Sequence, residues 1–184
     1  EGDAITAVAI ETEGAAAQLN QKPIVSAVLA GLMGVFSDTV NMVNAPFLAK
    51  ERGIDVREVR HDRDGDYNTL LRVTVTTASG ARSVAGTIFG KGQPRLVEIY
   101  GIKVEADLDG DMLFVINEDA PGFIGRLGSA LGEAGVNIGT FHLGRREAGG
   151  EAVLLLSIDG AVPEPVLWSV CQIEGVKKVK ALNF

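Results

Sequence analysis

The stretch Asn117-Glu-Asp-Ala-Pro-Gly-Phe-Ile-Gly125 decides the fold of the C-terminal half of this chain, because a predicted strand ends and a predicted helix begins within it. Before it, Met112–Ile116 is a short apolar run of strand length. Pro121 and Gly122 have the chemistry of a turn, and Gly135 is placed to end the helix. Between them, apolar residues recur at helical spacing on one face, at positions 123, 124, 127, 130, 131 and 134.

The rest of this half predicts three more strands and one more helix. Val136–Leu143 and Ala152–Ile158 are strand-like runs joined by the polar turn 146–150, which indicates a hairpin. Pro163–Glu174 carries apolar residues at helical spacing, and Val176–Phe184 closes with a strand. The resulting order, β-α-β-β-α-β, is the ferredoxin-like split βαβ arrangement.

Two helices are expected in the N-terminal half. Ile24–Phe36 predicts a helix that begins beside Pro23, since proline prefers the first helical turn. Pro46–Arg52 predicts a second, short helix, with Asn44 as its cap and Gly53 just after its last residue.

Strands make up most of the remaining N-terminal half. Residues 4–12 predict a strand and residues 14–21 a loop. From Ile54 the apolar period becomes two, most clearly over Leu71–Thr76, which indicates a half-buried strand. Glycine-containing turns then separate three further expected strands, at 82–89, 95–99 and 102–106.

The acidic, glycine-containing segment 107–111 interrupts these patterns and is the expected domain boundary. The predicted fold class is therefore α/β, of the α+β kind. We expect a mixed-sheet domain at residues 3–106 and a ferredoxin-like domain at residues 111–184.

The turn at Pro121 has the outline of an anion site. Backbone N–H groups at a helix N-terminus are unpaired and carry partial positive charge, so they can hold a carboxylate. Asp119 beside the turn can accept hydrogen bonds from an ammonium group, and an amino acid carries both groups. Asn137 is notable because asparagine is disfavoured within a strand unless its side chain is hydrogen-bonded. The same residues also fit a plain helix cap and turn, and propensity does not separate the two readings.

Composition excludes several functions. With 184 residues, 46% hydrophobic and 22% charged, the chain can bury a core and has room for two small domains. A net charge of −7 without a basic cluster argues against nucleic acid. The longest apolar run, Ile24–Phe36, is shorter than the roughly 18 residues of a membrane span.

Cys171 is the only cysteine, which excludes an intrachain disulfide and favours a cytoplasmic setting. Because the sequence begins at Glu1 without a methionine or a leader, we expect a piece of a longer protein. His61 and His142 are far apart and have no ligand-spaced partner, so no metal is expected.

Two glycine-rich segments are not nucleotide sites. Residues 86–92 are one residue short of a P-loop and lack its serine or threonine. Residues 122–128 lack the G-x-G step of a dinucleotide fingerprint, and Arg145 and Arg146 stand where an acidic ribose partner is expected. With no nucleophilic triad either, we expect no catalytic residue and no cofactor in this chain.

Asp119-x-Pro-Gly, followed by Gly135-Val-Asn-Ile138, resembles the ACT domain signature, and the terminal strand fits that of the family. Upstream, Val43-Asn-Ala-Pro46 and Gly86-Thr-Ile-Phe-Gly90 resemble the intervening regulatory domain of long-form D-3-phosphoglycerate dehydrogenases, as do 51–54 and 98–102. The pair of domains in this order is more specific than the ACT signature alone.

The resemblance implies an NAD-dependent parent that oxidises 3-phosphoglycerate in the first step of serine synthesis, with neither the chemistry nor NAD in this chain. It implies self-association as a homodimer or homotetramer, with L-serine bound between two ACT domains. Asn117 departs from the histidine or tyrosine common in the family and leaves the effector open. The implied effector-binding residues are Asn117, Asp119, Pro121, Gly122, Phe123, Ile124 and Asn137.

The resemblance also implies that the intervening domain binds a phosphorylated acid through basic residues. Lys91, Arg95 and Lys103 lie in the matching strands. The alternative is that they are solvated edge charges, as most charges on surface strands are.

Two other roles fit the sequence. One is a scaffold that holds an oligomer together without any ligand, and the other is regulation of an iron–sulfur L-serine dehydratase that shares the intervening domain. Binding measurements with L-serine distinguish the first, and the residues upstream of Glu1 distinguish the second.

Overall fold

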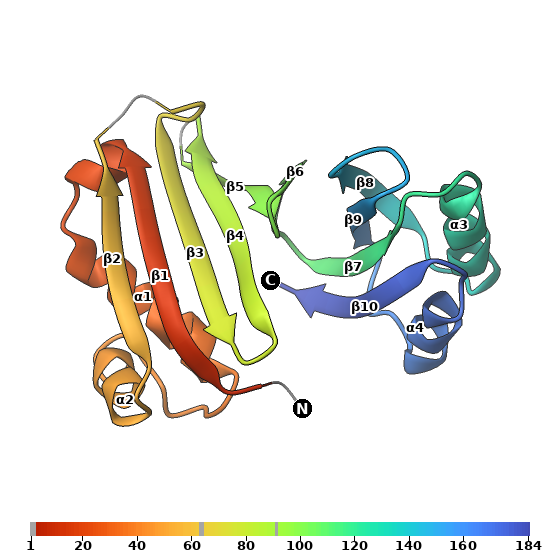
Figure 1. Ribbon diagram of the computed structural model, residues 1–184. Helices are drawn as coiled ribbons and strands as arrows, with labels where there is room; N and C mark the ends of the chain where they lie inside the picture. The colour runs from red at the N-terminus through yellow and green to blue at the C-terminus, as the bar shows by residue number, and fades with distance from the viewer. Residues whose placement is uncertain (1–2, 63–64, 91) are drawn as a thin grey trace. The chain divides into compact units, whose positions relative to one another are not determined.

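The structure is a computed structural model of the chain and describes residues 3–62, 65–90 and 92–184. The chain divides into two compact units, residues 1–93 and 94–184 (Figure 1). The strand order is β2-β1-β3-β4-β5-β6 in a six-stranded mixed sheet and β10-β7-β9-β8 in a four-stranded antiparallel sheet. The predicted α/β fold class is thereby confirmed.

The first unit is a sheet with two helices and one 3-10 turn. Its elements are β1 (Ile5–Gly14), η1 (Ala15–Gln18), α1 (Gln21–Gly34), α2 (Ala45–Glu51), β2 (Asp55–His61), β3 (Thr69–Thr77) and β4 (Gly80–Phe89). The two helices form the crossover between β1 and β2, which pair in parallel, whereas β3 pairs antiparallel on the other side of β1. Val8 and Ile10 of β1 pack against Val25, Leu29 and Met33 of α1 to form the core.

The second unit consists of a hairpin, a four-stranded sheet and two helices. Its elements are β5 (Gln93–Ile99), β6 (Ile102–Ala106), β7 (Asp111–Glu118), α3 (Phe123–Glu133), β8 (Ile138–Arg145), β9 (Glu151–Ile158), α4 (Glu164–Cys171) and β10 (Val176–Asn183). The order β7-α3-β8-β9-α4-β10 matches the predicted β-α-β-β-α-β arrangement. Strand β8 is an edge strand of its sheet.

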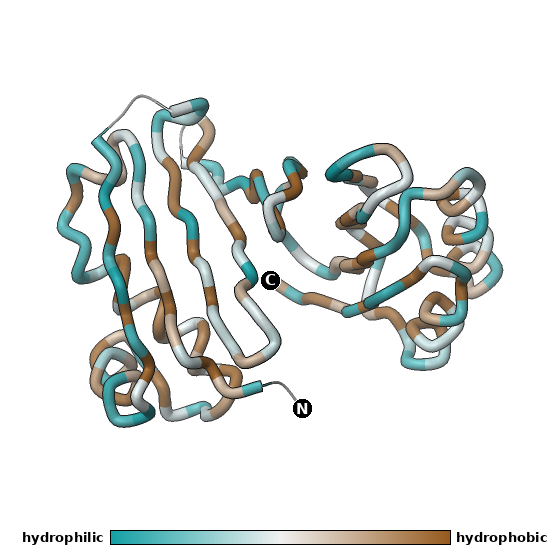
Figure 2. Tube along the Cα trace, viewed as in Figure 1, coloured by the Kyte–Doolittle hydropathy of each residue, from teal (hydrophilic) through white to brown (hydrophobic). Residues whose placement is uncertain are grey.

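Both faces of the four-stranded sheet are covered. Leu113, Val115 and Leu154 pack with buried residues of α3 and α4 on one face. Phe114 and Leu155, on the opposite face, pack with the β5–β6 hairpin. Strands β7 and β9 are therefore nearly continuous apolar runs, as expected of strands buried on both sides. Figure 2 shows hydrophobic segments gathered inside this unit and hydrophilic ones on its outer loops.

The β5–β6 hairpin is held by contacts from β7 and from the β8–β9 hairpin. Tyr100 has a left-handed φ of 54°, and its carbonyl oxygen accepts a hydrogen bond of 2.8 Å from Nη2 of Arg146. The Tyr100 ring meets Phe114 edge to face, with centroids 6.3 Å apart. Gly144 lies so close to β6 that an added Cβ would overlap the Lys103 carbonyl oxygen. Because β5 and β6 share a core with β7 and β9, the compact units differ from the expected domains 3–106 and 111–184, which stay a prediction.

Most predicted elements are present, with shifted ends. Helix α1 begins at Gln21, three residues earlier than expected, because the Asn20 side chain accepts a hydrogen bond of 3.2 Å from the Lys22 N–H. The predicted cap at Asn44 is wrong in its chemistry. Its side chain makes no cap bond and instead accepts a hydrogen bond of 2.8 Å from the Asn41 N–H. Gly53 and Gly135, as predicted, follow their helices with left-handed φ values of 70° and 74°.

The close approach at Gly144 predicts a stability difference between two glycine substitutions. Gly144→Ala should lower the free energy of unfolding by about 1–3 kcal/mol, because the methyl group pushes against β6. Gly128→Ala is the control: it has open space around its Cβ position in α3 and should raise stability by about 0.5–1 kcal/mol. Urea unfolding followed by circular dichroism measures both, and equal effects would contradict the packing.

Candidate functional site

The turn between β7 and α3 is fixed by backbone contacts. The Asp119 N–H donates to the Gly150 carbonyl at 2.8 Å, which ties the end of β7 to the β8–β9 hairpin. Gly122 sits at the N-cap with φ of 80°, a conformation that favours glycine, while Phe123 is buried beneath the helix. Ile124 is half exposed. The first turn of α3 therefore opens outward beside Asp119.

Asp119 is engaged by its own chain. Its Oδ2 accepts hydrogen bonds from Arg145 Nη1 at 2.7 Å and from the Gly149 N–H at 3.2 Å. The Arg145 guanidinium is the main cause that holds the pKa of the Asp119 carboxyl below its usual range, and the Gly149 amide adds to it. The Asp119 side chain is 22% exposed and that of Arg145 is 55% exposed. The pair is thus accessible to a competing ligand.

Asn117 has an unsatisfied acceptor. The residue is 2% exposed, and its Nδ2 donates to the Glu118 carbonyl at 2.6 Å. Its Oδ1 is buried and has no hydrogen-bond partner. A buried acceptor without a donor is unfavourable by roughly 1–3 kcal/mol. A ligand that donates a hydrogen bond to this oxygen would therefore gain binding energy.

Asn117, Ala152 and Arg145 form a row across three strands. Asn117 pairs with Ala152 in the β7–β9 register, and Arg145 pairs with Ala152 in the β8–β9 register. Each stands two or four positions from a residue of the helix-facing core on its own strand, so the row lies on the face that carries α3 and α4. Asp119 follows the row and reaches Arg145 at its far end. We call Asn117, Asp119, Arg145 and Ala152 the β7-end site.

Asn137 lies at the other end of the sheet. It precedes β8, and its Nδ2 donates to Asp159 Oδ2 at 2.7 Å. Ile138 pairs with Ile158, whereas Arg145 pairs with Ala152, so the length of β8 separates Asn137 from the β7-end site. Seven residue steps along a strand span roughly 23 Å. One chain therefore does not bring Asn137 to Asn117 and Asp119.

Two of the three basic residues expected to bind a phosphorylated acid have partners of their own. Lys91 lies outside the described residues. Arg95 forms an ion pair with Asp107, and Lys103 lies opposite Glu98 in the β5–β6 register. These contacts reduce the positive charge available to an anion, and the site stays a prediction.

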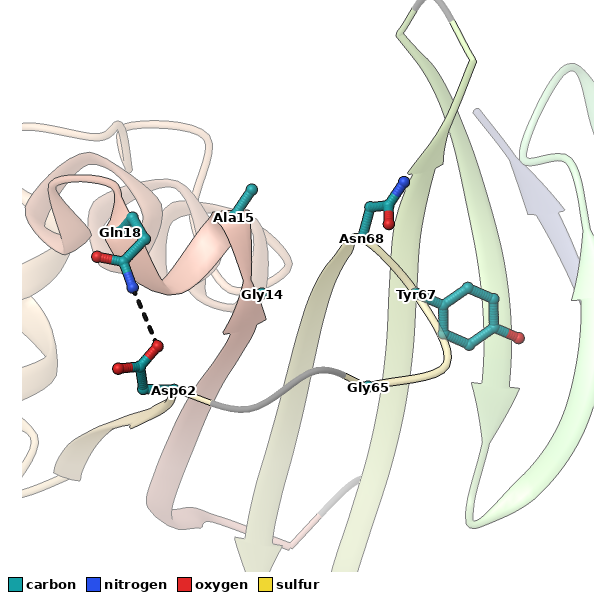
Figure 3. Close-up of a pocket in the computed structure, with 7 residues that line it drawn as sticks. All are labelled: Gly14, Ala15, Gln18, Asp62, Gly65, Tyr67 and Asn68. Carbon is teal, nitrogen blue, oxygen red and sulfur yellow. Dashed lines mark hydrogen bonds between the residues drawn. The ribbon is translucent and has the colours of Figure 1, made fainter.

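A polar pocket of about 510 Å³ lies in the first unit, at the carboxyl ends of the parallel strands β1 and β2 (Figure 3). Gln18 Nε2 donates to Asp62 Oδ1 at 3.4 Å across it. The sequence offered no signal for this pocket. We assign it no ligand. The lining residues that the structure describes are mostly small or neutral, and Asp62 is the one charged side chain among them: Gly14, Ala15, Gln18, Asp62, Gly65, Tyr67 and Asn68.

Within residues 3–62, 65–90 and 92–184, no three histidine, cysteine, aspartate or glutamate side chains gather as metal ligands. Across the same part of the chain, none of the helices has the length and apolar character needed to cross a bilayer.

Sequence reasoning did not identify Arg145 as a site residue. Its position in the sequence is the one indication: it stands at the end of the second strand of the ferredoxin-like unit. The antiparallel hairpin places the end of this strand, β8, near the end of β7. Only the register shows that it faces the same side as Asn117.

Comparison with known proteins identifies both domains. Residues 1–100 match the D-3-phosphoglycerate dehydrogenase intervening domain, and residues 112–173 match the ACT domain. The D-3-phosphoglycerate dehydrogenase of Bacillus subtilis is 34% identical over 177 residues, which cover 96% of this chain and 34% of that protein. The enzyme of the same name from Synechocystis is 33% identical over 159 residues, 86% of this chain and 29% of that protein.

A third relative, the D-3-phosphoglycerate dehydrogenase of Methanocaldococcus jannaschii, is 34% identical over 158 residues, 85% of this chain and 30% of that protein. The chain thus spans about a third of the length of these relatives. These matches favour a dehydrogenase parent over an L-serine dehydratase. The chain belongs to the D-3-phosphoglycerate dehydrogenase intervening-domain family and carries an ACT domain after that domain.

Proposed function

We propose that two copies of this chain pair through their ACT domains and bind L-serine between them, as the regulatory region of an NAD-dependent D-3-phosphoglycerate dehydrogenase in the cytoplasm. The parent enzyme would oxidise 3-phosphoglycerate, and L-serine, the end product of that pathway, would slow it. An effector acts in this way only if it binds one arrangement of the subunits more tightly than the other.

The observation that carries the proposal is the separation of Asn137 from the β7-end site in a single chain. Strand β8 is an edge strand, and such strands present unpaired N–H and C=O groups that can pair with another chain. Antiparallel pairing of β8 with β8 of a second copy, about a two-fold axis, sets the start of one strand beside the end of the other. Asn137 of each copy would then approach Arg145 and Asp119 of its partner.

The chemistry of the assembled site suits an α-amino acid. Asp119 and the unpaired Oδ1 of Asn117 are acceptors for an ammonium group. The first turn of α3, at Ile124 and Gly125 just after Pro121 and Gly122, offers backbone N–H groups to a carboxylate. Asn137 from the second copy would supply an amide, which hydrogen-bonds a hydroxyl such as that of serine.

NAD does not fit this chain. Dinucleotides bind at a glycine-rich turn that follows a strand of a parallel sheet. The glycines at 122, 125 and 128 follow β7, which lies in an antiparallel sheet. NAD and the catalytic residues would therefore belong to the rest of the parent enzyme.

Calorimetry with L-serine tests the residues of the site. Asp119→Ala should weaken binding by roughly ten- to a hundredfold, the loss expected for a hydrogen bond to a charged group, and Asn137→Ala by roughly two- to tenfold, the loss expected for a neutral one. Asn183→Ala is the matched control, because it also removes an asparagine–aspartate hydrogen bond, to Asp111, but on the other edge strand, β10. Normal binding by both site variants would refute the pocket. Dimers that give no heat with L-serine would favour a structural scaffold.

Subunit mixing tests whether the site is shared between chains. Asn117→Ala and Asn137→Ala each damage both sites of their own homodimer, but a mixed dimer keeps one intact site. Exchange at equal concentrations should therefore restore about a quarter of the wild-type binding capacity. Mass spectrometry verifies the exchange. No recovery despite complete exchange would contradict a site built from two chains.

A further inference from the structure

We propose that Arg145 is the carboxylate-binding residue of the β7-end site and that it changes partner when the effector binds. In the unliganded chain its guanidinium pairs with Asp119. With an α-amino acid bound, it pairs with the ligand carboxylate, and Asp119 receives the ligand ammonium group. This inference rests on the proposed function, because it concerns the same site.

The register makes the exchange geometrically possible. Arg145 and Asn117 flank Ala152 on one face of the sheet, about two strand spacings or ~10 Å apart. Ala152 between them has only a methyl group but is fully buried, so a ligand reaches this row only when the side chain that covers it moves. The long Arg145 side chain reaches Asp119 at the end of this row, and its change of partner would open the row to a small molecule.

Charge balance favours the exchange. The unliganded site holds one positive and one negative side chain, and a zwitterionic amino acid adds one charge of each sign. After binding, two ion pairs replace one, and no charge is left alone. Arginine prefers a bidentate carboxylate, whereas a single Nη1 contact joins Arg145 to Asp119 in the unliganded chain.

Two contacts hold the acceptors in place once Arg145 has moved. The Gly149 N–H still donates to Asp119 Oδ2, and the Asn117 Nδ2 still donates to the Glu118 carbonyl. The unpaired Oδ1 of Asn117 gains a donor from the ammonium group, which removes an unfavourable buried acceptor. The site should thus bind a ligand that has both a primary amine and a carboxylate more tightly than a ligand that has the amine alone.

The test compares ligands across variants of the whole chain. Calorimetry is run with L-serine and with ethanolamine, which has the same amine and hydroxyl but no carboxylate. Arg145→Gln should weaken L-serine binding by roughly ten- to a hundredfold and should not weaken the lower affinity for ethanolamine, which offers Arg145 no carboxylate. Arg146→Gln is the matched control, because it removes the same charge from the next residue, which faces Tyr100 instead. Its L-serine affinity should stay within about twofold.

Arg145→Lys is a second variant, which controls for loss of binding through misfolding. It keeps the positive charge beside Asp119 but cannot bind a carboxylate in the bidentate geometry. It should weaken L-serine binding by several-fold. Wild-type affinity in both Arg145 variants would overturn this inference but not the proposed effector site. No binding of L-serine by the unaltered chain would overturn the proposed function itself.

Arg126 is the competing cation, since its Nη1 lies 3.2 Å from where a Cβ on Gly122 would be. Loss of binding in Arg126→Gln but not in Arg145→Gln would also overturn the inference.

Carbon-13 NMR of the Asp119 carboxyl provides a readout without ligand. Its pKa should rise in Arg145→Gln, because the guanidinium that stabilises the charged form is gone. An unchanged pKa would mean that the ion pair is absent in solution, which overturns the exchange of partners.

Discussion

Burial of the four-stranded sheet on both faces is the constraint on which the second unit depends. Strands β7 and β9 supply alternate residues to two cores, one against α3 and α4 and one against the β5–β6 hairpin. A polar side chain inside either strand would have to lose its hydration without compensation. Polar residues can therefore emerge only where the strands end, and that is where Asn117 and Asp119 lie.

The same constraint shapes the chemistry at the strand end. Asn117 is the last inward-facing residue of β7, so it is buried like its apolar neighbours but carries an acceptor with no donor. Asp119, one step beyond the strand, is partly exposed and recruits Arg145 from β8. A small zwitterion satisfies these groups better than the chain satisfies them alone. Its ammonium group is a donor for Asn117, and its carboxylate is a second acceptor for Arg145.

The β8–β9 hairpin links this site to the opposite face of the sheet. Arg145 reaches toward the helix side, whereas its neighbour Arg146 holds the Tyr100 carbonyl of the β5–β6 turn. Side chains of consecutive strand residues point to opposite faces, so two adjacent arginines can contact both layers at once. Gly144 completes the arrangement by letting the β6 backbone approach β8.

The sequence by itself determined the elements of the fold and their order, because apolar periodicity, proline and glycine act locally. It indicated the turn at Pro121 and the ferredoxin-like order of residues 111–184, but it did not single out β2 at Asp55–His61, whose short, charged sequence has a weak alternation. Tertiary structure decided which residues meet. Arg145 joined Asp119, Asn137 was carried to the far end of β8, and β5–β6 packed on the second sheet. These outcomes depend on strand register and on which face each strand buries, and both are set by contacts between residues far apart in the chain.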